Sequence, residues 1–194
     1  MIQKFLFHID KMKLIAISGK CGAGKDKLAG KIFEYLNAQG IKYAHLKFAA
    51  NLKLMASILT GGDLEDQYSD EGKEKIIDEL GVTNGSLQQV LGTILREKLH
   101  PDIWIFPVLK FARNNPDTVC VISDCRFQNE ATLIKEAGGV IIRLNRKNRN
   151  IGTRDPNHIS ETDLDDYPYF DLIIDNDGTV EEMIKRAFAF LQFK

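Results

Sequence analysis

The sequence predicts an α/β protein built on a doubly wound parallel sheet, and two observations carry this expectation. Short apolar runs of strand type alternate with amphipathic runs of helix type along most of the 194 residues. The first apolar run, 14–18, enters a glycine-rich turn that is followed at once by a helical run, 28–36. Such alternation places parallel strands side by side, with helices on both faces and ligands beyond the carboxyl ends of the strands.

The other strands and helices follow in order from the same periodicity. Apolar runs predict strands at 14–18, 41–48, 117–123, 140–144 and 172–174. We expect a helix from 48 that is broken at Gly61–Gly62, helices capped by Ser86 and by Asp102, a helix at 129–137, and a closing helix opened by Thr179. Residues 63–80 are acidic and weakly periodic, which favours a solvated helical hairpin over the site.

Length and composition indicate a single globular domain. We expect residues 1–12 to be an N-terminal extension and residues 13–194 to form the domain, with a lid at about 146–160. The net charge is −1, so no global field suggests a nucleic acid or a membrane surface as a partner. Three cysteines without metal-like spacing fit a reducing compartment, so we expect a cytoplasmic protein.

The glycine-rich turn has the G-x-x-x-x-G-K spacing of a P-loop. Its glycines permit positive φ, so that backbone N–H groups can turn inward around phosphate oxygens, and the following helix adds its positive dipole end. An ordinary glycine-rich turn between strand and helix is the alternative. The predicted ATP contacts in this stretch are Gly19, Lys20, Cys21, Gly22, Ala23, Gly24, Lys25, Asp26 and Lys27.

Two carboxylates are candidate magnesium ligands. Asp26 stands after Lys25, where a P-loop normally has a Ser or Thr hydroxyl that ligates Mg²⁺. A carboxylate can hold the ion directly or through water, although Asp26 can equally be a first-turn acid that favours the helix dipole. Asp124 ends an apolar strand, as the second magnesium-binding carboxylate of P-loop enzymes does, or it caps the following helix.

Arginines supply the remaining candidates for catalysis. Arg126 can grip a transferring phosphoryl group, so the predicted catalytic set is Lys25, Asp26, Asp124 and Arg126. A stretch with five cations can close over bound phosphates as a lid, or it can be a solvated face. These cations are Arg143, Arg146, Lys147, Arg149 and Arg154, of which we assign Arg146 to ATP. His158 and Glu161, which follow, are a weak signal that also fits a helix cap.

Several segments together resemble the deoxynucleoside monophosphate kinases of bacteriophages and large DNA viruses. They lie at 17–26, 48–53, 89–104, 122–131, 136–139, 158–161 and 175–179. The most specific are Asp-x-Arg-Phe-x-Asn-Glu from Asp124 and Asn-Asp-Gly from Asn176. The resemblance implies a P-loop kinase fold with a mobile lid and makes Asp26 a family trait. Lys27, where Thr is usual, and Asn51, where Pro is common, depart from the pattern.

The resemblance also implies an acceptor pocket. Its lining would include Lys53, Gln89, Trp104, Asp124, Arg126 and Glu130, to which we add Phe48 and Arg96 as candidates. Phe48 and Trp104 can each stack on a base, although either can simply fill a core.

We therefore expect an ATP-dependent, Mg²⁺-requiring kinase that phosphorylates a deoxynucleoside 5′-monophosphate, in the host cytoplasm if the chain is viral. The expected partners are small-molecule nucleotides, with no nucleic acid and no membrane, and a homodimer is left open. A kinase of another phosphate ester, similar to phosphomevalonate kinases, and a non-catalytic nucleotide-binding module are the alternatives. The sequence does not give the base, the sugar or the oligomeric state.

Overall fold

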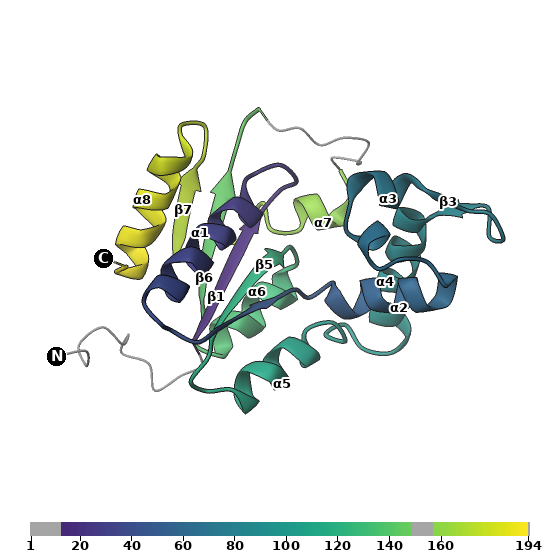
Figure 1. Ribbon diagram of the computed structural model, residues 1–194, viewed down its shortest axis with the longest axis horizontal. Helices are drawn as coiled ribbons and strands as arrows, with labels where there is room; N and C mark the ends of the chain where they lie inside the picture. The colour runs from purple at the N-terminus through teal and green to yellow at the C-terminus, as the bar shows by residue number, and fades with distance from the viewer. Residues whose placement is uncertain (1–12, 149–156, 194) are drawn as a thin grey trace. The chain divides into compact units, whose positions relative to one another are not determined.

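The computed structural model describes residues 13–148 and 157–193 (Figure 1). The chain divides into two compact units. The sheet unit comprises the residues up to Lys47 and from Leu109 onward, and the helical unit comprises residues 48–108. The predicted extension, 1–12, and the central part of the predicted lid, 149–156, lie outside the described residues. A single domain stays a prediction, because a division by packing does not test independent folding.

The sheet unit contains five parallel strands in the order β2-β5-β1-β6-β7. The strands are β1 (Leu14–Gly19), β2 (Tyr43–Leu46), β5 (Val119–Cys125), β6 (Val140–Asn145) and β7 (Leu172–Asp175). The predicted doubly wound parallel sheet is thus confirmed, although β2 is shorter than the predicted 41–48. Because the first strand lies at the centre of the sheet, its carboxyl end faces the crevice where such sheets bind ligands.

Helices cover both faces of this sheet (Figure 1). Helices α1 (Lys25–Ala38) and α8 (Val180–Leu191) pack on one face, where buried side chains such as Ile17, Ile32 and Ile142 form the core. Helix α6 (Gln128–Glu136) contacts β6 and β1. Removing this apolar surface from water is the main force that fixes the backbone of the unit. No described helix is long and apolar enough to cross a membrane.

Strand β5 carries a bulge at its carboxyl end. Its register against β1 shifts: between the pairs Ala16–Ile122 and Ser18–Cys125, β1 advances by two positions and β5 by three. Bulges of this kind re-aim side chains and are common beside active sites. The bulge falls on Ser123 and Asp124, the predicted site residue at this strand end.

The helical unit is built from short elements. They are α2 (Ala50–Thr60), the 3₁₀ helix η1 (Glu65–Gln67), α3 (Asp70–Glu74), the hairpin strands β3 (Ile76–Ile77) and β4 (Val82–Thr83), and α4 (Asn84–Lys98). The predicted helical hairpin at 63–80 is wrong: only two short helical turns form, and β3 pairs antiparallel with β4. The predicted break at Gly61 is confirmed, since Gly61 caps α2 in the left-handed conformation.

Two predicted helix starts are also wrong. Helix α4 is capped by Thr83, whose hydroxyl accepts from the N–H of Ser86, so Ser86 lies inside the helix. Helix α5 (Phe106–Asn114) begins after Asp102, whose carbonyl accepts from Ile105 N and Phe106 N in a preceding turn. The helix starts where Pro107 falls in its first turn, since proline lacks the N–H that a later helical position needs. Thr179 caps α8 as predicted.

A network of buried amides holds the helical unit together. The Gln67 side chain donates to Asn84 Oδ1 at 3.0 Å, and Asn84 donates in turn to the carbonyl of Gly72 at 2.9 Å. Gln88 donates to Gln67 Oε1 at 2.8 Å. Gln67 is fully buried and Asn84 nearly so. Because each buried amide has partners, the network costs little to bury and fixes α3 against α4.

Candidate functional site

The phosphate loop, Gly19–Lys25, lies between β1 and α1 as predicted. Gly24 has a φ of 100°, and a Cβ there would lie 2.7 Å from Asn176 Nδ2, so only glycine fits. Among the residues that the structure describes, the N–H groups of Gly22, Gly24, Lys25 and Asp26 have no hydrogen-bond acceptor. Unpaired amides at a helix start attract anions, so the loop can bind a group such as phosphate.

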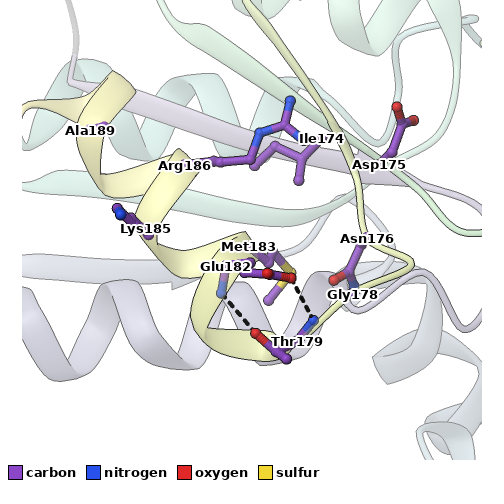
Figure 2. A pocket seen from close by; sticks show the side chains of 10 residues that line it. All are labelled: Ile174, Asp175, Asn176, Gly178, Thr179, Glu182, Met183, Lys185, Arg186 and Ala189. Carbon is purple, nitrogen blue, oxygen red and sulfur yellow. Dashed lines mark hydrogen bonds between the residues drawn. The ribbon is translucent and has the colours of Figure 1, made fainter.

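The turn between β7 and α8 is hydrogen-bonded to this loop. Asn176 Nδ2 donates to the carbonyl of Ala23 at 2.9 Å, and Asn176 is buried. Figure 2 shows how the same turn is fixed: Thr179 N donates to Glu182 Oε2, and Glu182 N donates back to Thr179 Oγ1. The reciprocal capping pair holds the start of α8 and with it the Asn-Asp-Gly segment.

Lys25 is 8% exposed and donates to the carbonyl of Lys20 at 2.9 Å. Burial and the Arg126 guanidinium lower the pKa of Lys25 to about 8, against the opposing effect of Glu161, Asp26 and Cys21. The lowered pKa means that the nearby acids do not fully balance the positive charge of the Lys25 ammonium. A bound phosphate would therefore stabilise this charge strongly.

Asp26 projects from the first turn of α1, with its side chain 79% exposed. Lys47 Nζ and Ser123 Oγ each lie 3.4 Å from Asp26 Oδ1, and Ser123 is in turn 2.8 Å from His45 Nε2. Burial and Lys47 lower the pKa of His45, whereas Asp26 and Asp124 oppose the shift. Both predicted magnesium ligands thus act on one imidazole, and Lys47 and Ser123 approach Asp26 equally closely.

Arg126 follows the β5 bulge and is held by two glutamates. Glu130, which is 2% exposed, accepts from Arg126 N at 2.8 Å and from Phe127 N at 3.1 Å. The side chain of Arg126 forms an ion pair with Glu161, which is 7% exposed. Glu130 thus caps the start of α6, and its predicted contact with the acceptor stays a prediction.

Glu161 is the functional candidate that our sequence reasoning did not select. It lies on α7 (Ile159–Thr162), and its Oε2 accepts from the N–H of Cys21 in the phosphate loop at 2.7 Å. Burial alone would raise the pKa of Glu161, but the Cys21 N–H, Arg126 and Lys25 lower it. The signal was the His-x-Ser-Glu segment, from which His158 caps α7 by accepting from Ser160 N. A capping role for His158, the alternative stated above, is confirmed.

Lys20 and Arg146 line one pocket of about 460 Å³ with Leu144, Asn145, Lys147, Asp175 and Asp177. The structure therefore brings together two residues that we assigned to ATP. Arg143 does not belong to the predicted mobile cluster: it is buried in β6 and donates to Ser18 Oγ and Asp165 Oδ1. Arg149 and Arg154 lie outside the described residues.

The remaining predicted acceptor residues belong to the helical unit. Trp104 is buried, and its Nε1 donates to the carbonyl of Gly92 at 3.3 Å; Arg96 Nη1 lies 3.4 Å from the same oxygen. The Lys53 ammonium sits 3.8 Å from the centre of the Tyr68 ring. Phe48 is buried and Gln89 is exposed. Trp104 and Arg96 thus come together, and a role in binding the acceptor stays a prediction for all five.

Comparison with known proteins identifies a family and a fold that this chain resembles. A family model for deoxynucleotide monophosphate kinases matches residues 74–187. The "Putative deoxynucleotide monophosphate kinase" of Acanthamoeba polyphaga mimivirus is 31% identical over 192 residues, covering 92% of this chain and 95% of that protein. The APS kinase CysC of Mycobacterium tuberculosis, solved with AMPPNP and APS, gives a TM-score of 0.51 at 13% identity, over 94% of this chain and 98% of that one. This last likeness concerns the fold alone.

Proposed function

Because the chain belongs to the deoxynucleotide monophosphate kinase family, we propose that it transfers the γ-phosphoryl group of ATP to a deoxynucleoside 5′-monophosphate and releases the diphosphate. One observation carries the proposal: Glu161 joins Arg126 to Cys21 N, so the arginine is held at the same loop on which Lys25 Nζ lies, 2.9 Å from the carbonyl of Lys20. Two cations held at one loop gain most when a highly charged phosphate binds there.

The loop and the pocket beside it suit the donor. The amides of Gly22, Gly24 and Lys25 would hold the β- and γ-phosphates together with the Lys25 ammonium. The pocket next to Lys20 and Arg146 is of a size that accepts part of a nucleotide. AMPPNP in the structurally similar APS kinase is consistent with ATP as the donor.

The residues near Asp26 fit a magnesium ion. The carboxylate is exposed, and Mg²⁺ in kinases commonly takes only one or two protein carboxylates beside phosphate oxygens and water. Asp26 would hold the ion, with Asp124 as the second candidate and Ser123 as a hydrogen-bond partner of Asp26. The ion would supply neutralisation of phosphate charge.

Transfer of a phosphoryl group between two phosphates requires alignment and charge neutralisation, and it needs no covalent intermediate with the protein. The acceptor is already an anion, so no strong general base is needed, and Asp124 would act electrostatically. Arg126 would bind the acceptor phosphate and stabilise the charge that spreads over the transferring group, because its guanidinium is planar and always charged.

Turnover with a panel of monophosphates tests the proposal. The purified chain is incubated with ATP, Mg²⁺ and each common deoxy- or ribonucleoside monophosphate, and product diphosphates are separated by ion-exchange chromatography. We expect at least one deoxynucleoside diphosphate to form, and none in the Arg126→Ala variant within the same time. Phosphomevalonate serves as the competing acceptor.

Two results would reject the proposal. Turnover with phosphomevalonate but with no nucleotide would assign the chain to another phosphate ester. Tight binding of ATP without turnover of any acceptor would make it a nucleotide-binding module.

A further inference from the structure

Glu161 uses both carboxylate oxygens inside the sheet unit. Oε2 accepts from the backbone N–H of Cys21, 2.7 Å away, and Oε1 pairs with Arg126 Nη1. The carboxylate side chain is only 5% exposed, and the Arg126 side chain 19%. A charge this deeply buried is retained only when it is paired and hydrogen-bonded. Glu161 therefore forms a bridge from the arginine to the first turn of the phosphate loop.

The segment that carries Glu161 is fixed on both sides of this residue. Before it, the carbonyl of Ser160 lies 3.3 Å from Arg126 Nη1. After it, Asp163 accepts from Gln128 N at 2.7 Å, and its carbonyl accepts from the Gln128 side chain. Moving the carboxylate out of the loop would therefore break several hydrogen bonds at once.

A second anchor lies four residues after Glu161. Asp165 forms ion pairs with Lys20 of the phosphate loop and with Arg143 of β6, at 2.6 and 3.1 Å. One pair ends on the loop and the other on a buried strand, so the α7 region is tied to both. The bridge is thus part of a fixed framework around the loop.

The alternative is a latch, in which the carboxylate occupies the phosphate site and must leave before ATP enters. The contacts argue against it. Glu161 accepts from the amide of Cys21, whereas the amides of Gly22, Gly24, Lys25 and Asp26 have no acceptor within the described part of the chain. Most of the cradle is therefore open while the bridge is closed.

We propose that Glu161 is a positioning residue: its carboxylate ties Arg126 to Cys21 of the phosphate loop and so sets where the arginine meets the transferring phosphoryl group. This inference rests on the proposed function. Glu130 fixes the backbone of Arg126, and Glu161 fixes the guanidinium. Without Glu161, Arg126 keeps its charge and its backbone contact with Glu130, but its guanidinium loses the ion pair that orients it.

The kinetic test uses Glu161→Gln, which keeps the shape of the side chain and removes its charge. We expect kcat to fall about 10- to 100-fold, because small misplacements of a positioning group cost this much, while the affinity for Mg–AMPPNP stays within about threefold. Glu136→Gln, an exposed change on α6, is the matched control and should leave both quantities unchanged. Glu161→Asp keeps the charge but shortens the reach, so its kcat should lie between those of the wild type and of Glu161→Gln, and it also serves if Glu161→Gln does not fold.

A double-mutant cycle with Arg126→Lys separates positioning from a structural role. If Glu161 acts through the arginine, the second substitution adds little to the loss caused by the first. Independent losses that multiply, or an unchanged kcat in Glu161→Gln, would overturn the proposal. So would tighter binding of Mg–AMPPNP by Glu161→Gln with kcat preserved, which is the behaviour of a latch.

A readout without turnover keeps this inference apart from the proposed function. The ¹⁵N-labelled Cys21 amide, hydrogen-bonded to a carboxylate, should resonate downfield in the free protein and move upfield in Glu161→Gln but not in Glu136→Gln. If no monophosphate is phosphorylated while this signal responds, the proposed function fails and the bridge stands. If turnover is found and the Cys21 signal does not respond, the bridge fails alone.

Discussion

The sheet unit and the helical unit are stabilised by different forces. The core of the sheet unit is made of aliphatic side chains from four of its five strands, α1 and α8, most of them fully buried. The helical unit buries the amides of Gln67 and Asn84, whereas Ile58 and Leu59 on α2 are 70% and 63% exposed. Apolar burial is non-directional and tolerates local change, but a buried hydrogen bond is lost completely when one partner is removed.

This difference explains where unpaired polar groups are found. In the sheet unit, the apolar core fixes β1 and α1, so the loop between them can leave several amides without acceptors among the described residues at a modest cost. The helical unit also buries apolar side chains such as Phe48 and Trp104, but the buried amides of Gln67 and Asn84 join its elements and must be satisfied. We therefore expect substitutions at polar positions of the phosphate loop to affect activity, and substitutions in the buried amide network of the helical unit to affect stability.

The largest expected effect is on activity and lies in the sheet unit. Lys25→Ala should lower kcat about 10²- to 10³-fold, the loss seen when one charge-stabilising donor is removed from an active site. Its melting temperature should stay close to that of the wild type, since Lys25 contributes a partly desolvated cation and not an apolar contact. Steady-state kinetics and a thermal melt measure both.

Lys31→Ala on the same helix is the matched control. Lys31 is a surface residue paired with Glu34 three positions on, and exposed pairs contribute little. Turnover near the wild-type level in Lys25→Ala would contradict both the assignment of the loop and the contrast between the units.

The second prediction concerns pH. Burial, followed by Arg126, lowers the pKa of Lys25 from 10.5 to about 8, so the free protein loses this charge as the pH rises through 8. Because kcat/KM reports the free enzyme, its value for ATP should fall by about tenfold per pH unit above 8. In Lys25→Arg the guanidinium stays protonated, so this decline should be absent whatever the absolute activity.

Stability should change in the opposite direction over the same range. Between pH 8 and 10.5 the unfolded chain holds a proton on Lys25 that the folded protein has released, so the contribution of this group to the free energy of unfolding rises with pH. Loss of activity above pH 8 would then not reflect unfolding. The same decline in Lys25→Arg would show that another group titrates.

The third prediction tests the helical unit. Asn84→Ala removes the amide that joins Gln67 to the carbonyl of Gly72, and each buried group left without a partner costs about 1–3 kcal/mol. Asn115→Ala removes one exposed hydrogen bond to the carbonyl of Phe111 and should change the free energy of unfolding by less than about 0.5 kcal/mol. Urea unfolding measures both, and equal effects would contradict the importance of the buried network.

The same contrast explains what the sequence could predict. In the sheet unit, the alternation of apolar runs and helices, the glycine spacing of the phosphate loop and the cap at Thr179 are local signals, and each is confirmed. In the helical unit, η1 and α3 are joined to α4 through Asn84, which contacts Gln67 and Gly72, 17 and 12 positions earlier. Periodicity does not reveal these contacts or the pairing of β3 with β4, so the prediction for 63–80 was wrong. The prediction for Ser86 was wrong for a local reason, because Thr83, three residues earlier, is the cap.

The candidate site follows the same rule. Lys25, Asp26 and the loop amides were predictable because they are consecutive in the sequence. The bridge from Glu161 to Arg126 and Cys21 spans 35 and 140 positions, and nothing in the residues near Glu161 indicates which cation it meets. Arg143 was misassigned for the opposite reason: it follows the charge pattern of its neighbours, but β6 lies between β1 and β7 and is buried on both faces there, so Arg143 is in the interior.

The smallest expected effects compare one interaction in the two units. Thr179 and Ser69 each accept from a backbone N–H at the start of a helix, at 3.2 Å from Glu182 N and 3.0 Å from Gly72 N. Replacing either by Ala should cost about 1 kcal/mol. Helix α8 contributes to the main core, so Thr179→Ala should lower the free energy of global unfolding by this amount. Helix α3 has five residues and no large apolar face, so the cost of Ser69→Ala should appear as faster amide exchange confined to residues 48–108. If both variants instead lower the same global transition equally, the two units unfold as one, and the contrast between them is one of composition and not of cooperativity.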